Sequence, residues 1–248
     1  MKLLAFESLV GGAGATTLTA NLAAALQRHG EQVAVLDLCA QNNLAAHFAQ
    51  QLAEPRGLFD DQGLVASVLD NSFRAASEVI VVPFGAPKRQ PTASQCVEAF
   101  DKTLTALTTL QSVSVTYLLV NLPTGHSFQD SCYLPKDTPC MLVFEPEPRS
   151  YIALQRWHYA HKASPTMRYR GLINKVAPHM ELQRDSYDLM RAELSDGWLL
   201  PYSINRDQHV PEALATQQLI YEYTLGAQAN ADIQEVAFWL TTESEQLA

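Results

Sequence analysis

Apolar runs of strand length alternate along this chain with segments of helical periodicity, and this alternation constrains the fold more than any other feature. The runs are nearly continuous, as a sheet that is covered on both faces requires. Strands that alternate with helices form a parallel sheet through right-handed crossovers. The pattern therefore predicts the α/β class: a doubly wound, mostly parallel sheet of about seven strands flanked by helices.

The expected elements can be assigned to residue ranges. Seven apolar runs predict strands at Lys2–Glu7, Gln32–Leu38, Val79–Phe84, Tyr117–Leu122, Cys140–Phe144, Tyr169–Ile173 and Trp198–Pro201. Apolar residues spaced three and four apart predict helices at Thr17–His29, Ser94–Leu110, Arg149–His161, Glu181–Leu194 and Ile233–Leu240. The 248 residues, of which 47% are hydrophobic, suffice for one large core, so we expect residues 1–248 to form a single domain.

Charge and cysteine content argue against several classes of protein. The formal net charge is −9, with 17 Lys plus Arg against 26 Asp plus Glu, and this excess of negative charge disfavours nucleic acid as a partner. The four cysteines show no spacing typical of a zinc site or a disulfide framework. No stretch approaches the roughly 20 apolar residues of a membrane span. We therefore expect a soluble, cytoplasmic protein.

A glycine-rich loop follows the first expected strand directly and precedes the first expected helix. It reads VGGAGATT over residues 10–17. Glycines let the backbone wrap closely around an anion, and the N-terminal amides of the following helix point at it. The alternative is a glycine-rich turn that binds nothing, but the strand–loop–helix context favours a nucleotide pocket. The expected binding residues are Gly11, Gly12, Ala13, Gly14, Ala15, Thr16 and Thr17.

Two polar residues stand where further strands end. Asp37 closes the second strand, and Asn121 closes the strand that begins at Tyr117. Open α/β sheets bind ligands at the carboxyl ends of their strands, so both residues are candidates for the nucleotide site. Taken alone, each residue would favour the alternative of strand-end capping and turn chemistry; their matching order at strand ends shifts the balance towards a nucleotide site. Oxygen ligands suit Mg²⁺, and we expect Thr16 and Asp37 to be the metal-binding pair.

These motifs resemble the ParA/MinD family of deviant Walker A nucleotide-binding proteins. That family's loop, KGGxGKT, carries lysines where this chain has Val10 and Ala15. The family's catalytic aspartate corresponds to Cys39, and its Walker B aspartate to Asn121. Phosphoryl transfer depends on positioning and charge neutralisation, so these replacements imply that hydrolysis is weak or absent.

The family resemblance continues towards the C-terminus. Residues 171–175, GLINK, resemble the strand that ends in an adenine-contacting asparagine, here Asn174. Residues 199–207, LLPYSINRD, resemble the loop that closes over the base and contribute Pro201 and Asn205. A strand followed by an ordinary polar turn would give a similar sequence.

Within that group, the lysine-less loop, the DxC segment, VPFG at residues 82–85 and the stretch from 199 to 223 resemble the BcsQ (YhjQ) type of cellulose biosynthesis protein. The resemblance implies a regulatory or scaffold subunit of a bacterial cellulose secretion system. It further implies bound ATP or ADP, with Mg²⁺ as a candidate metal, and a nucleotide-sandwich homodimer. The implied partners are a BcsR-like small protein and components of the cellulose synthase complex. The tail after Leu240, TTESEQLA, is short and acidic, so recruitment to the inner membrane would run through partners, without direct membrane insertion.

Two alternatives stay open on the sequence. The chain could be an active ParA/MinD-type positioning ATPase that uses another cation, for which Arg149 and Arg156 on one expected helix are candidates. It could also be a pseudo-ATPase that no longer binds nucleotide and survives as a dimerisation fold.

Overall fold

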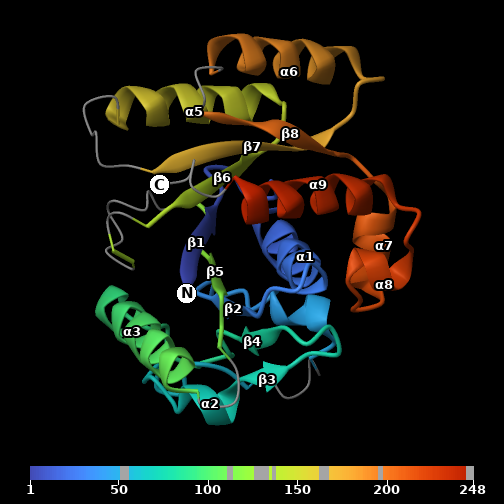
Figure 1. Cartoon of the computed structure of the whole chain (residues 1–248). Coiled ribbons are helices and arrows are strands. Elements are labelled where there is room, and N and C mark those ends of the chain that lie inside the picture. The colour runs from blue at the N-terminus through green and yellow to red at the C-terminus, as the bar shows by residue number, and fades with distance from the viewer. Residues whose placement is uncertain are drawn as a thin grey trace.

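A single eight-stranded sheet forms the centre of the molecule (Figure 1). The computed structural model describes residues 1–50, 56–110, 114–125, 134–135, 138–161, 168–194 and 198–243. The strand order is β3-β4-β2-β5-β1-β6-β7-β8, and every pair is parallel except β3 with β4. The strands are β1 Lys2–Glu7, β2 Val33–Asp37, β3 Phe73–Arg74, β4 Ile80–Val82, β5 Tyr117–Asn121, β6 Cys140–Phe144, β7 Tyr169–Val176 and β8 Leu199–Asn205.

Helices cover both faces of this sheet (Figure 1). Helices α1, α7, α8 and α9 lie on one side, and α3, α5 and α6 lie on the other, with the short α2 beside α3. Their bounds, with the 3₁₀ helix η1, are α1 Ala15–Arg28, η1 Ala45–Phe48, α2 Val68–Asn71, α3 Ala93–Thr109, α5 Pro148–His161, α6 Glu181–Glu193, α7 His209–Ala215, α8 Ile220–Tyr223 and α9 Gln228–Thr242. The predicted doubly wound α/β fold is confirmed.

Alternate residues of each central strand belong to two separate cores. In β1, Leu4 and Phe6 pack in the core beneath α1 and α9, whereas Ala5 joins the core beneath α3 and α5. In β5, Leu119 packs in the core beneath α1 and α9, and Leu118 packs in the core beneath α3 and α5. Both faces of the sheet are therefore dry, which is why the strands read as continuous apolar runs in the sequence.

The sheet reverses its direction of winding at β1. The chain places β2 and β4 on one side of β1, returns through β5 beside it, and then places β6, β7 and β8 on the other side. The loop after β1 consequently lies between the carboxyl ends of β5 and β6. This switch point is where open α/β sheets form their ligand crevice.

The structure corrects the sequence expectations at several places. The sheet has an eighth strand, the two-residue β3, which pairs antiparallel with β4. Strand β8 does not end at Pro201 but continues to Asn205. Because β8 is an edge strand, paired with β7 alone, a proline can sit in it without breaking an internal ladder. The helix expected at Ile233–Leu240 is longer at both ends, and α7 and α8 were not expected.

Membrane-spanning character is not found in any helix of the described residues: none is both long enough and apolar enough to cross a bilayer. The last residues of the acidic tail, 244–248, lie outside the described part.

Candidate functional site

The glycine-rich loop adopts a conformation that its sequence makes necessary. Gly12 and Gly14 have φ values of 85° and 96°, in the region that favours glycine, and α1 begins at the next residue, Ala15. A Cβ atom at Gly14 would lie 2.4 Å from Nδ2 of Asn174, whereas one at Gly11 would meet nothing within 4 Å. The loop therefore leads into the helix N-terminus, with free backbone amides, through a tight approach to β7.

A cavity of about 880 Å³ opens in front of this loop, and we call it the loop cavity. Its walls come from the loop itself, from the segment after β2 and from the end of α7. Among the described residues its lining contains two basic side chains, Lys175 and His47, and no acidic one. The lining residues used below are Gly11, Gly12, Gly14, Ala15, Thr16, Thr17, Cys39, His47, Lys175 and Gln217.

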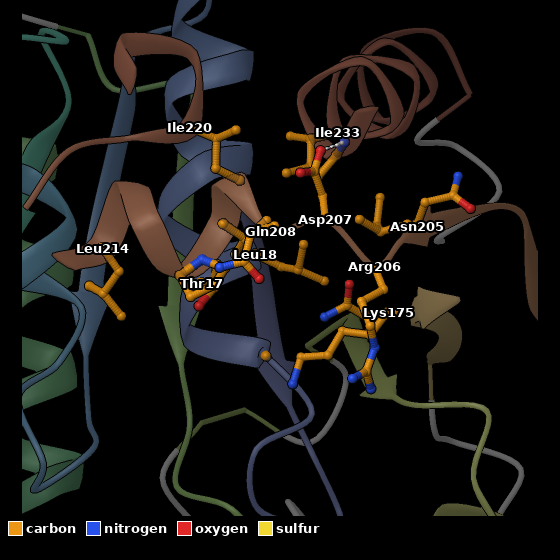
Figure 2. Close-up of a pocket in the computed structure, with 16 residues that line it drawn as sticks. Thr17, Leu18, Lys175, Asn205, Arg206, Asp207, Gln208, Leu214, Ile220 and Ile233 are labelled. Carbon is orange, nitrogen blue, oxygen red and sulfur yellow. Dashed lines mark hydrogen bonds between the residues drawn. The ribbon is translucent and has the colours of Figure 1, made fainter. Parts of the chain in front are cut away.

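A second cavity of about 360 Å³, the apolar cavity, lies on the other side of Thr17 (Figure 2). Leu18 of α1, Ile220 of α8 and Ile233 of α9 face into it, while Lys175 and Arg206 lie together at one end (Figure 2). The two cavities share Gly14, Thr17, Lys175 and Leu214. An apolar pocket joined to a helix N-terminus suits a ligand with a flat apolar part and an anionic part.

The polar residues at the strand ends meet beneath the loop cavity. Asp37 and Asn121 are register partners, and Nδ2 of Asn121 donates to Oδ1 of Asp37 at 2.9 Å. The same amide lies 3.2 Å from Oγ1 of Thr16 and 3.2 Å from Sγ of Cys39. Asp37 also accepts hydrogen bonds from the backbone amides of Cys39 and Leu44. The sequence predicted that Thr16, Asp37 and Asn121 lie close together, and in the structure the Asn121 amide contacts the other two side chains.

Burial governs the protonation of this cluster. It raises the pKa of the Asp37 carboxyl to about 6, although the hydrogen bonds from Cys39, Asn121 and Leu44 act in the opposite direction. Burial, and then the neighbouring Asp37 carboxylate, raise the pKa of the Cys39 thiol well above its ordinary value. Burial lowers the pKa of the His47 imidazole to about 4. At neutral pH the Cys39 thiol and the His47 imidazole are consequently neutral.

Metal-binding capacity here is modest. Among the described residues no group of three or more His, Cys, Asp or Glu side chains could hold a metal ion. Thr16 lines the loop cavity, whereas Asp37 and Asn121 are fully buried behind it. One hydroxyl and one buried carboxylate are oxygen donors that Mg²⁺ accepts, but most ligands would have to come from water and a phosphate.

The residues expected to contact a base divide into two groups. Asn174 and Asn205 line the apolar cavity. Nδ2 of Asn174 donates to the carbonyl of Ala13 at 2.7 Å, and Asn205 donates through its backbone and side chain to Asp232 at 2.7 and 3.0 Å. Pro201, within the described residues, lines neither cavity; it is exposed on β8, and its carbonyl accepts from Arg191 at 3.3 Å.

Among the lining residues that the sequence did not predict, two offer hydrogen-bond donors to a ligand in the loop cavity. Lys175 donates through Nζ to the carbonyl of Gly12 and pairs with Glu145 at 2.8 Å. Gln217 has a left-handed φ of 56°, and its buried Nε2 has no hydrogen-bond partner among the described residues. Lys175 directly follows Asn174 at the carboxyl end of β7, a signal that could have been used; nothing in the sequence pointed to Gln217.

Arg149 and Arg156, the cations considered from the sequence, do not reach either cavity in the described part of the chain. Arg149 pairs with Glu147 at 3.0 Å and with Glu145 at 3.8 Å. Arg156 is exposed on α5. Neither residue compensates for the missing lysines of the loop in this structure.

Comparison of the fold with solved structures defines the class. MinD from Aquifex aeolicus matches with a TM-score of 0.75 and 17% identity, over 97% of both chains. MinD complexed with Mg-ADP from Pyrococcus horikoshii OT3 matches with a TM-score of 0.74 and 19% identity, over 100% of this chain and 98% of that one. The chain thus has the MinD/ParA P-loop NTPase fold.

Sequence comparison gives the particular family. The family described as "Cellulose biosynthesis protein BcsQ" matches residues 1–241. The curated BcsQ proteins of Salmonella typhi and Escherichia coli (strain K12) are each 28% identical to this chain, over 96% of it and 94% of their own length. The chain belongs to the BcsQ family.

Proposed function

We propose that this protein is a cytoplasmic accessory subunit of a bacterial cellulose secretion system that binds ATP or ADP and turns it over slowly or not at all. The observation that carries the binding part is the junction of the two cavities at Gly14, Thr17 and Lys175. A base and sugar fit the apolar cavity, and the phosphates fit the loop cavity. Membership of the BcsQ family supports the role in cellulose biosynthesis.

The glycine-rich loop and its neighbours support the binding of a nucleotide. The loop can approach β7 because Gly14 has no Cβ atom, which would meet Nδ2 of Asn174. The first residues of α1 line the loop cavity, and so does Gln217, whose buried Nε2 has no hydrogen-bond partner among the described residues. When bound, a nucleotide would supply a phosphate chain whose charge the loop amides and Thr16 stabilise. Thr16 and Asp37, with Asn121 as an acceptor, would hold the accompanying Mg²⁺ weakly, because a single carboxylate is present.

Slow turnover follows from the residues that stand at the reactive end. Cys39 carries a neutral thiol where water activation needs a carboxylate acceptor, and Ala15 carries no charge where a cation would stabilise the transferring phosphoryl group. The same residues leave ground-state binding through backbone amides intact. We therefore infer a nucleotide-stabilised scaffold instead of a motor.

Partners follow from the same proposal. We infer a homodimer that encloses nucleotide between the two protomers, a small BcsR-like protein and components of the cellulose synthase complex as partners, and recruitment to the inner membrane through them. Nothing in the net charge of −9 supports nucleic-acid binding.

A thermal unfolding series tests this function. Mg²⁺-ATP or Mg²⁺-ADP at about 100 times its dissociation constant should add roughly 2.7 kcal/mol to the free energy of unfolding. Phosphate release should stay at the background rate. No stabilisation at saturating nucleotide would favour the pseudo-ATPase that has lost its ligand, and phosphate release that Thr16→Ala abolishes would favour the active ATPase.

A further inference from the structure

Strand β7 is irregular where it passes the glycine-rich loop. Its register with β8 pairs Ile173 with Ser203 and Val176 with Asn205, so two residues of β7 oppose one residue of β8. This is a β-bulge, and the extra residue, Lys175, has a left-handed φ of 57°. Lysine adopts this conformation rarely, and bulges commonly redirect a side chain beside a functional site.

The bulge makes two consecutive side chains reach the same loop. Asn174 donates to the carbonyl of Ala13, and Lys175 donates to the carbonyl of Gly12. In a regular strand, successive side chains point to opposite faces of the sheet, so one of the two would point away. The strained backbone therefore serves to bring the ammonium group of Lys175 to the loop.

A buried carboxylate holds the ammonium group in place. Oε1 of Glu145, which follows β6 and is only 3% exposed, lies 2.8 Å from Nζ of Lys175. The other oxygen of Glu145 pairs with Arg206 at 3.5 Å. Lys175 and Arg206 lie together at the end of the apolar cavity, and the amine of Lys175 points towards the start of α1 (Figure 2).

Positive charge is scarce in the lining of the loop cavity. Within the described residues, Lys175 is the one lysine or arginine that lines the loop cavity, and it also lines the apolar cavity. The loop itself has Val10 and Ala15 and contributes no cation. A phosphate chain that bridges the two cavities would have to pass this ammonium group.

Building on the function proposed above, we propose that Lys175 is a phosphate-binding residue that supplies, from β7, the positive charge missing from the loop. In the structure its Nζ contacts the neutral carbonyl of Gly12, a weaker partner than a phosphate oxygen. The ammonium group exchanges this carbonyl for the phosphate when nucleotide binds. Glu145 acts as a positioning residue that keeps the side chain at the junction of the cavities.

Calorimetric titration of ADP and of adenosine into wild type and Lys175→Met tests the proposal. The dissociation constant for ADP should rise about ten- to a hundredfold, the usual effect of a lost charge-assisted hydrogen bond, while that for adenosine stays unchanged. Lys175→Arg should keep most of the ADP affinity, and Glu145→Gln should give an intermediate loss. Lys102→Met, which removes an exposed lysine that pairs with Glu98 on α3, should change neither.

The outcomes separate this proposal from the function on which it rests. If wild type binds ADP more tightly than adenosine and Lys175→Met does so equally well, the role of Lys175 is overturned and the nucleotide site stands. If wild type binds ADP no more tightly than adenosine, both fail.

A labelling experiment on the wild-type protein tests the proposal even if the variants do not fold. Acetylation of lysines, followed by mass spectrometry, should show Lys175 protected by ADP but not by adenosine. Equal labelling of Lys175 under both conditions would contradict the proposal.

Discussion

The loop cavity and the apolar cavity adjoin each other but offer a ligand different chemistry. The loop cavity has the geometry of a phosphate cradle without the charges: Ala15, Cys39 and the buried Asn121 stand where the resembling family has Lys, Asp and Asp. The apolar cavity, lined by aliphatic side chains and asparagines, retains the groups expected to contact a base. Binding of a nucleotide needs the groups of the apolar cavity and the backbone amides of the loop cavity, whereas hydrolysis needs charged side chains in the loop cavity. The comparison thus separates a ligand-binding role from a catalytic one.

In the loop cavity, substitution of Gly14 should have the largest effect on stability and on nucleotide binding. Gly14→Ala places a Cβ atom 2.4 Å from Nδ2 of Asn174 at a φ of 96°, so we expect a loss of about 3 kcal/mol in the free energy of unfolding and no stabilisation by nucleotide. Gly12→Ala is the matched control, since its φ of 85° is strained in the same way while its Cβ meets nothing within 4 Å, and it should cost about 1–2 kcal/mol. Chemical denaturation of both variants measures the difference. Equal stability of the two variants would refute the tight approach of loop and strand.

The titration of the buried residues Asp37 and His47 should make the free energy of unfolding depend on pH. Burial raises the folded-state pKa of Asp37 to about 6, above its ordinary value of 3.8, so the stability that this group contributes is complete below that ordinary value and is lost as the pH rises through 6. The loss amounts to about 3 kcal/mol. His47 titrates in the opposite sense, because burial lowers its pKa to about 4, so its contribution is lost as the pH falls from 6.5.

A comparison of variants isolates the contribution of Asp37. The free energy of unfolding of wild type minus that of Asp37→Asn should fall by roughly 3 kcal/mol between pH 4 and pH 7. A difference that is flat over this range would show that Asp37 is not buried as described. The difference between wild type and His47→Gln should move the other way.

Restoring a carboxylate at the end of β5 should exchange stability for metal affinity. Asn121→Asp removes the donor that lies 2.9 Å from Oδ1 of Asp37 and puts two carboxyl groups together, so we expect a loss of about 2 kcal/mol without metal. Mg²⁺ in the presence of ADP should recover the loss, because two carboxylates bind this ion better than one. Thermal unfolding with and without Mg²⁺ measures both. Failure of Mg²⁺ to stabilise the variant more than wild type would place the metal elsewhere.

The smallest expected effect lies on the apolar side. Asn205→Ala removes a side-chain donor to Asp232 at 3.0 Å while the backbone bond remains, so we expect a loss of about 1 kcal/mol and a weaker affinity for adenosine. Pro201→Ala, four residues earlier on the same strand and outside both cavities, is the control and should leave adenosine binding unchanged. Equal effects of the two changes on adenosine binding would argue against a base site in the apolar cavity.

Much of the fold was predictable because both faces of the sheet are buried. Continuous apolar runs such as Val33–Asp37 leave little choice of element, and their order with the helices sets the topology. The proximity of Thr16, Asp37 and Asn121 was predictable from the parallel topology. Asp37 and Asn121 end β2 and β5, and Thr16 opens the helix that follows β1, so all three lie at the carboxyl edge of the sheet. The loop conformation followed from its glycines.

Two features could not be predicted, because they depend on register. Periodicity ended the last strand at Pro201, whereas the edge position of β8 lets the strand continue to Asn205, and Pro201 lines neither cavity. The bulge of β7 likewise has no sequence signature. The place of Lys175 directly after Asn174 is visible in the sequence, but nothing there indicates that both side chains reach the same loop. The two arginines considered from the sequence lie on α5, whereas the cation proposed to contact phosphate, Lys175, lies on β7.

The central claim is that backbone amides, a hydroxyl and one ammonium group still hold a polyphosphate in this loop. A crystal structure of the protein grown with excess Mg²⁺-ADP tests it most directly. We expect a diphosphate between residues 11–17 and Lys175, with the adenine enclosed by Leu18, Ile220 and Ile233. A loop closed on itself, with no nucleotide in either cavity at saturating concentration, would contradict it.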